Sequence, residues 1–119
     1  MSNAISSSAA RAFVQGKRFS KSNTNVRRNI DGSVEMSLWD NIIARHTVKD
    51  GTQVTMAGWG TATTRARLNA ITDELGVRGG FWQHQGEQFY GTHNSVVSGE
   101  ACSVCNRTIS TREWVQITR

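Results

Sequence analysis

The segment from Gly58 to Arg67 holds the densest group of residues that could bind a ligand. Thr61 or Thr63 is suited to cap a helix that begins there, because a threonine hydroxyl accepts hydrogen bonds from free backbone N–H groups. Arg65 and Arg67 then fall near the helix N-terminus, where the helix dipole disfavours a positive charge. The choice of arginine at these positions therefore needs an explanation.

A bound anion would supply one, because free N–H groups, threonine hydroxyls and guanidinium groups all attract a phosphate. The alternative is that Trp59 anchors the end of a strand in the core while the threonines only cap the helix. The candidate binding residues of this segment are Trp59, Thr61, Thr63, Thr64, Arg65 and Arg67.

The positive charge of the chain is concentrated near its start. Residues 1–30 carry six basic side chains and no acidic one, whereas eight basic and nine acidic side chains follow from Asp31 onward. The net charge of +5 therefore comes from the N-terminal quarter. Such a segment is either a solvated tail that aids solubility or an anion-binding face, with nucleic acid the first candidate anion. Its candidate nucleic-acid ligands are Lys17, Arg18, Lys21, Arg27 and Arg28.

Cys102 and Cys105 have the spacing of half a structural zinc site. The remaining ligands would have to be His93 and either His84 or His46, at spacings that match no common zinc module. No second Cys-x-x-Cys pair is present. We therefore predict that the protein holds no metal and that the two cysteines are reduced thiols in a loop.

Catalytic signatures are missing from the sequence. It contains no Gly-x-Ser-x-Gly, phosphate-loop or His-Glu-x-x-His motif, and its three histidines are scattered. We predict a protein that is not an enzyme and has no cofactor. No stretch approaches the roughly 18 to 20 apolar residues of a membrane span, and no secretory signal begins the chain. The expected location is the cytoplasm, without a membrane partner.

Strand periodicity and turn residues outline a mainly antiparallel sheet. Apolar and polar residues alternate over three consecutive stretches, and Asp40-Asn41 and Lys49-Asp50-Gly51 separate them as turns. A second hairpin turns at Gln85-Gly86-Glu87. The expected strands are residues 34–39, 42–48 and 52–59 as a meander, 81–84 and 88–90 as the hairpin, and 114–117 at the end of the chain.

One amphipathic helix is expected over residues 64–75. Leu68, Ile71, Thr72 and Leu75 form a stripe that can pack on a sheet, and Gly76 supplies the C-terminal stop. We expect residues 1–8 to be disordered and a short helix or arm to follow over residues 9–16. The predicted fold is a single α+β domain over residues 9–119: an antiparallel sheet of meander and hairpin with one helix packed on one face.

Several short runs also resemble a family of small uncharacterised proteins encoded by tailed bacteriophages. They include Gly16-Lys17-Arg18-Phe19, Leu38-x-x-Asn41-x-Ile43-Ala44 and the Gly-Trp-x-Thr-x-Thr-Thr-Arg-x-Arg-Leu-Asn string that begins at Gly58. The likeness covers about residues 16–90. It implies expression inside an infected bacterium, and it implies that Lys17 to Val26 belong to the folded domain.

The function that these features favour is binding of single-stranded DNA or RNA with little sequence preference. Basic side chains would neutralise phosphates, and Trp39, Trp59 or Trp82 would stack on bases if exposed. Two alternatives stay open: a host-takeover factor that binds and inhibits a bacterial protein, and a minor structural or virion-associated protein.

Overall fold

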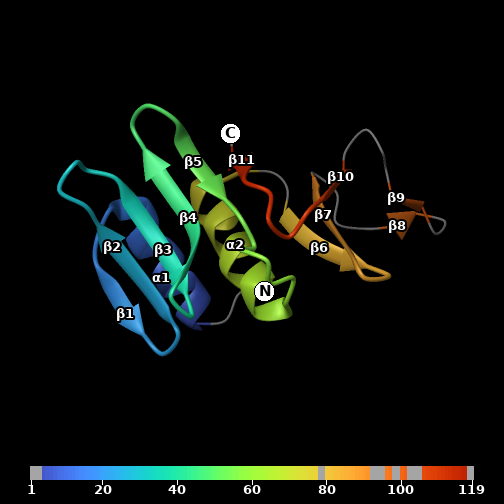
Figure 1. Ribbon diagram of the computed structural model, residues 1–119, viewed down its shortest axis with the longest axis horizontal. Helices are drawn as coiled ribbons and strands as arrows, with labels where there is room; N and C mark the ends of the chain where they lie inside the picture. Colours follow the sequence, from blue (N-terminus) through green and yellow to red (C-terminus); the bar gives the residue numbers. More distant parts are fainter. Residues whose placement is uncertain (1–3, 78–79, 92–95, 98–99, 102–105, 118–119) are drawn as a thin grey trace.

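The computed structural model describes residues 4–77, 80–91, 96–97, 100–101 and 106–117. Its largest element is an antiparallel sheet of six strands in the order β1-β2-β3-β4-β5-β11 (Figure 1). These strands are β1 Phe19–Lys21, β2 Thr24–Arg28, β3 Val34–Leu38, β4 Asn41–Thr47, β5 Gly51–Val54 and β11 Val115–Ile117. The predicted meander forms β3, β4 and β5, and the predicted terminal strand pairs with β5.

Two helices, α1 Ala4–Gln15 and α2 Ala62–Leu75, cover one face of this sheet and leave the other open (Figure 1). Alternation along β3 explains which face they cover. Val34, Met36 and Leu38 are buried, whereas Glu35 and Ser37 between them are half-buried on the opposite side. The core therefore lies between the helices and one side of the sheet.

Helix α1 begins earlier than expected. The disorder predicted for residues 1–8 is wrong from Ala4 onward, while residues 1–3 lie outside the described residues. Ser6, Ala9 and Ala10 are fully buried, because their small side chains let α1 pack closely against α2. Small polar residues that resemble a disordered end thus form a helix–helix contact.

The basic segment after α1 forms a β-hairpin and is not a solvated tail. Strands β1 and β2 pair with Phe19 opposite Val26 and Lys21 opposite Thr24, and β2 continues the sheet by pairing with β3. Thr24 and Val26 are buried and Arg27 is exposed. The mixture of threonine and arginine hides the strand alternation from a hydrophobicity pattern.

Helix α2 confirms the predicted caps. Thr61 is the N-cap and accepts a 3.2 Å hydrogen bond from the Thr64 backbone N–H, and Gly76 ends the helix at a left-handed φ of 71°. The predicted stripe also holds, since Leu68 and Ile71 are fully buried and Leu75 is half-buried. The stripe packs on α1 as well as on the sheet.

The predicted second hairpin is present as β6 Gly80–His84 and β7 Glu87–Gly91, but it lies apart from the meander. It pairs with β10 Asn106–Ile109 in a separate three-stranded sheet. The side chain of Asn69 joins this sheet to α2 by accepting from Phe81 N at 2.6 Å and donating to Phe81 O at 2.9 Å. Strands β8 Val96–Val97 and β9 Glu100–Ala101 form a further pair.

Candidate nucleic-acid interface

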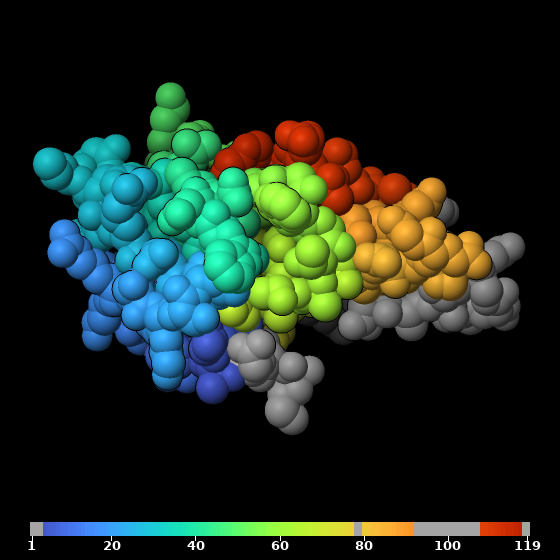
Figure 2. All heavy atoms as spheres, turned by 60° about the horizontal axis from the view of Figure 1, so that its bottom comes forward, coloured from blue at the N-terminus to red at the C-terminus, as the bar shows by residue number. Residues whose placement is uncertain are grey.

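A hollow of about 510 Å³ opens at one end of the six-stranded sheet, beside the start of α2. The buried side chains of Leu38, Ile43 and Met56 line its inner part. Trp39 and Trp59 line its outer part and are 71% and 60% exposed. The β1–β2 turn in light blue, the β3–β4 turn in teal and the yellow-green segment leading into α2 lie side by side here (Figure 2).

Trp39 occupies a backbone position that suits other residues better. It forms the two-residue β3–β4 turn with Asp40, and their φ angles are 52° and 66°. Hairpin turns with two positive φ angles favour Asn-Gly or Asp-Gly, because a side chain in this region costs roughly 1–2 kcal/mol. Burial does not offset that cost, since most of the indole faces solvent.

Trp59 is exposed by a sharp bend after β5. Strand β5 ends at Val54, short of the predicted residue 59, because Ala57 and Gly58 have φ angles of 52° and 89°. The Trp59 backbone N–H then donates to Met56 O at 2.8 Å. The alternative that Trp59 anchors the core is therefore wrong.

The three threonines of the segment differ in accessibility. Thr61 and Thr63 are exposed at the hollow, whereas Thr64 is 1% exposed. The Thr61 hydroxyl lies 3.0 Å from the Thr64 hydroxyl and also caps α2. The Thr63 hydroxyl has no hydrogen-bond partner within the part of the chain that the structure describes.

Arg65 bonds to groups of the protein itself. Its guanidinium Nη1 lies 3.0 Å from Gly60 O, 2.9 Å from Gln83 Oε1 and 3.0 Å from Gln88 Oε1. These oxygens offset the unfavourable position of the charge near the helix N-terminus without a bound anion. Arg65 thereby ties the start of α2 to the second sheet.

Arg67 is 4% exposed and lies in the interior. It donates to Ser6 Oγ at 2.6 Å, to Thr24 Oγ1 at 2.9 Å and to Asn23 Oδ1 at 3.2 Å. Burial lowers the pKa of Arg67 from its ordinary value. These three partners are neutral, and the side chain joins α1, β2 and α2 instead of reaching the surface.

The other predicted basic ligands are exposed on the β1–β2 hairpin and its flanks. Arg18 and Arg27 border a shallow groove of about 420 Å³ over β1 and β2. Arg27 and Arg28 are neighbours on one strand, so they point to opposite faces of the sheet. Lys21 adjoins the β1–β2 turn, which contacts the Trp39 turn through the 2.9 Å bond from Trp39 N to Asn23 O.

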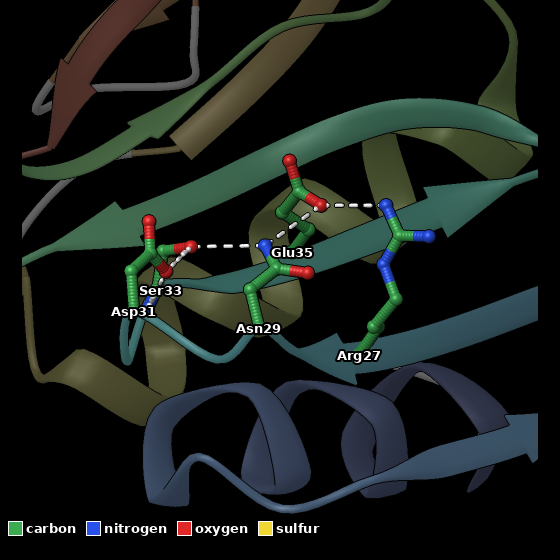
Figure 3. A network of polar contacts seen from close by, with 5 residues as sticks. All are labelled: Arg27, Asn29, Asp31, Ser33 and Glu35. Atoms are coloured by element: carbon green, nitrogen blue, oxygen red, sulfur yellow. Dashed lines mark hydrogen bonds and ion pairs between the residues drawn. The ribbon is translucent and has the colours of Figure 1, made fainter.

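A polar network holds Arg27 in place (Figure 3). Its Nη2 contacts Glu35 Oε1 at 2.7 Å, and Asn29 Nδ2 donates to the same oxygen at 3.2 Å and to Ser33 Oγ at 2.9 Å. The hydrogen bond from Arg27 is the main cause that lowers the pKa of Glu35. Hydrogen bonds from Ser33 lower the pKa of Asp31. The sequence analysis missed this network, although polar residues at every second position from 27 to 35 could have indicated it.

The remaining aromatics are engaged with neighbours. Trp82 stacks on Phe89 with ring centroids 4.5 Å apart, and the guanidinium of Arg45 lies 5.2 Å over the ring of Trp114. Of the three tryptophans considered for base stacking, Trp39 and Trp59 are thus the exposed ones.

Two further predictions concern metals and membranes. Cys102, Cys105 and His93 lie outside the described residues, so their prediction stays untested. Within the described ranges, no three His, Cys, Asp or Glu side chains gather as a metal site requires. None of the helices in those ranges is long and apolar enough to span a membrane.

The family comparison covers the hollow, both tryptophans and the basic hairpin. The family model described as Kyanoviridae Gp96 protein matches residues 2–116. Searches of curated proteins and of solved structures gave no match. The predicted likeness to a tailed-phage protein family is therefore confirmed, and the chain belongs to the Kyanoviridae Gp96 protein family.

Proposed function

We propose that this protein binds single-stranded nucleic acid with little sequence preference, in the cytoplasm of the infected bacterium. The observation that carries the proposal is the pair of exposed tryptophans, Trp39 and Trp59, at one hollow. Aromatic side chains on which bases stack are a recurring means of binding single strands, because every base has a π-face.

The cost of placing Trp39 supports a role in binding. The positive φ of Trp39 is unfavourable for a bulky side chain, and because the indole is exposed, packing does not offset the free-energy cost of this conformation. Strained backbone positions concentrate at binding and catalytic sites. A ligand that covers the indole would supply the missing burial.

Charge favours a nucleic acid over a neutral ligand such as a sugar. The β1–β2 hairpin carries exposed cations, and Lys21 adjoins the turn in which Asn23 O accepts from Trp39 N. We assign phosphate contacts to Lys17, Arg18, Lys21 and Arg28, because Arg27 is already paired with Glu35 at 2.7 Å. Arg67 is excluded by its burial, and Arg65 is already bonded to protein oxygens.

Fluorescence anisotropy with labelled oligo-dT and oligo-U tests the proposal. Four to six phosphate contacts imply a log–log salt slope of roughly −3 to −4 on single strands. Replacing Lys17, Arg18 and Lys21 together by alanine should flatten the slope by about 2. An absence of binding to both oligonucleotides at about 50 mM salt, where phosphate-driven binding is strong, would contradict the proposal.

Aromatic substitutions separate stacking from charge. Trp59→Ala should weaken binding about fivefold or more, since stacking contributes about 1–3 kcal/mol per base, and should leave the salt slope unchanged. Trp114→Ala is the matched control, because this tryptophan is also exposed but lies against Arg45 away from the hollow. Equal losses for both variants would count against the hollow as the binding surface.

A host protein is the second candidate partner. Ile30 and Val48 are fully exposed aliphatic residues in the β2–β3 and β4–β5 connections, which lie at the same end of the sheet because Val34 pairs with His46. A pull-down from infected cells with and without nuclease separates the two classes. Retention of one specific host protein after nuclease treatment, lost in the Ile30→Ser/Val48→Ser variant, would favour the protein partner.

A further inference from the structure

We infer that the hollow between Trp39 and Trp59 is a pocket for a single nucleobase, so that free mononucleotides bind there. The inference rests on the proposed function and names the unit that the site recognises. The hollow has a volume of about 510 Å³, which lies within the roughly 300–1,000 Å³ of ligand pockets. A flat stacking surface would not enclose such a volume. The hollow therefore accommodates an inserted base and not only a strand lying across it.

The apolar residues that line the hollow match the two flat faces of a base. Leu38, Ile43 and Met56 are each 5% exposed or less and form the floor of the hollow, so the apolar surface that a base would cover belongs mainly to the indole rings of Trp39 and Trp59. A base has apolar π-faces, which match these side chains and the indole rings. Insertion would remove apolar surface from water on both the base and the protein, which stabilises the complex.

The edge of a base is polar, and polar groups line the hollow as well. Asn41 donates through Nδ2 to Trp39 O at 3.1 Å, which leaves its Oδ1 as an acceptor. Thr63 offers a hydroxyl that has no partner among the described residues. An acceptor and a rotatable hydroxyl can pair with N–H and carbonyl groups of several bases. This arrangement agrees with weak discrimination between bases.

Backbone hydrogen bonds hold the main chain at both tryptophans before a ligand arrives. Trp39 is fixed by its N–H bond to Asn23 O, and Asn23 is itself bound by the buried Arg67. Trp59 is fixed by its N–H bond to Met56 O. A pocket with a preformed backbone loses less conformational entropy on binding. A single nucleotide can therefore bind without neighbouring phosphate contacts.

The test is a titration of the full chain with UMP and with AMP, followed by the indole N–H peaks in NMR spectra. The chain has four tryptophans, which can be assigned by single substitutions. We expect saturable shifts for Trp39 and Trp59 and none for Trp114. Ribose 5-phosphate, which lacks a base, should shift none of them.

Trp39→Asn is the decisive variant, because asparagine favours the positive φ of this turn and the variant keeps the fold. It should weaken UMP and AMP binding at least fivefold. Unchanged mononucleotide affinity in this variant, or equal shifts with ribose 5-phosphate, would overturn the inference.

The outcomes also separate this inference from the proposed function. Oligonucleotide binding that depends on Trp59, combined with no response to either mononucleotide, would overturn the base pocket and leave single-strand binding intact. Mononucleotide binding without oligonucleotide binding would support the pocket and overturn the proposed function. Failure of both ligands would overturn both.

Discussion

The guanidinium of Arg67 donates a 2.6 Å hydrogen bond to the hydroxyl of Ser6, across 61 positions of the chain. Both side chains are buried, and the bond joins α2 to the first turns of α1. Through Asn23 the same guanidinium reaches the turn that holds Trp39. A residue that the sequence suggested as a phosphate ligand thus supports the walls of the hollow from inside.

Removal of Arg67 should be strongly destabilising. Arg67→Ala removes the hydrogen bonds that the guanidinium donates to Ser6 and Thr24 and leaves a space where the buried side chain lay, so we expect the free energy of unfolding to fall by about 2–4 kcal/mol. Urea denaturation followed by circular dichroism measures it. Arg11→Ala, an exposed arginine on α1, is the matched control and should stay within about 0.5 kcal/mol. Equal effects would refute the structural role of Arg67.

Much of the fold could be predicted because its signals are local. Apolar residues three and four apart identify α2, and glycine or asparagine turns separate the strands of the meander and the second hairpin. The short helix expected over residues 9–16 is present as the second half of α1, whereas the helical turn before it and the β1–β2 hairpin after it could not be predicted in this way. The buried hydroxyls of Ser6 and Thr24 both accept hydrogen bonds from Arg67, and that partner lies far along the chain.

The candidate site was predicted only in part for the same reason. Thr61 and Thr63 were the two candidate caps because they precede an apolar stripe, which is local information, and Thr61 is the one that caps α2. Helical spacing does place Arg67 on the buried face of α2, three residues after Thr64 and four before Ile71, whereas Arg65 lies off that face. The polar groups that accept from the buried guanidinium lie far along the chain, and no local pattern predicts them. Trp39 is exposed because its own φ angle is positive, and Trp59 is exposed because Ala57 and Gly58 before it have positive φ angles. A tryptophan in the sequence does not predict such a backbone conformation.

Loss of the α2 cap should have a smaller effect than loss of Arg67. Thr61→Ala removes the oxygen that accepts from Thr64 N, and we expect a loss of about 1 kcal/mol in unfolding free energy. Thr61→Asp should retain the cap. Thr63→Ala, which leaves the cap intact, should change stability by less than about 0.5 kcal/mol. A larger loss for Thr63→Ala than for Thr61→Ala would argue against the N-cap at Thr61.

Acid should weaken the β2–β3 network. The hydrogen bond from Arg27 lowers the pKa of Glu35 below its ordinary value of 4.5, so folding favours the ionised form. The stabilisation is present above the ordinary pKa and is lost as the pH falls through the lower pKa of the folded state. Unfolding free energies between pH 6 and pH 3 should therefore fall more steeply for the natural chain than for Glu35→Gln. Parallel curves for the two proteins would contradict the assignment.

Trp39→Asn should separate stability from binding. Asparagine tolerates the left-handed backbone of the β3–β4 turn, whereas tryptophan pays about 1 kcal/mol there and gains little burial. We expect the variant to be more stable by up to about 1 kcal/mol and to bind oligo-dT at least fivefold more weakly. Thermal unfolding and anisotropy on the same preparation measure both effects. Trp114→Ala controls for removal of an exposed indole, and it should not weaken binding. A Trp39→Asn protein that is less stable than the natural chain would mean that the indole is retained for packing, and the argument from uncompensated strain would fail.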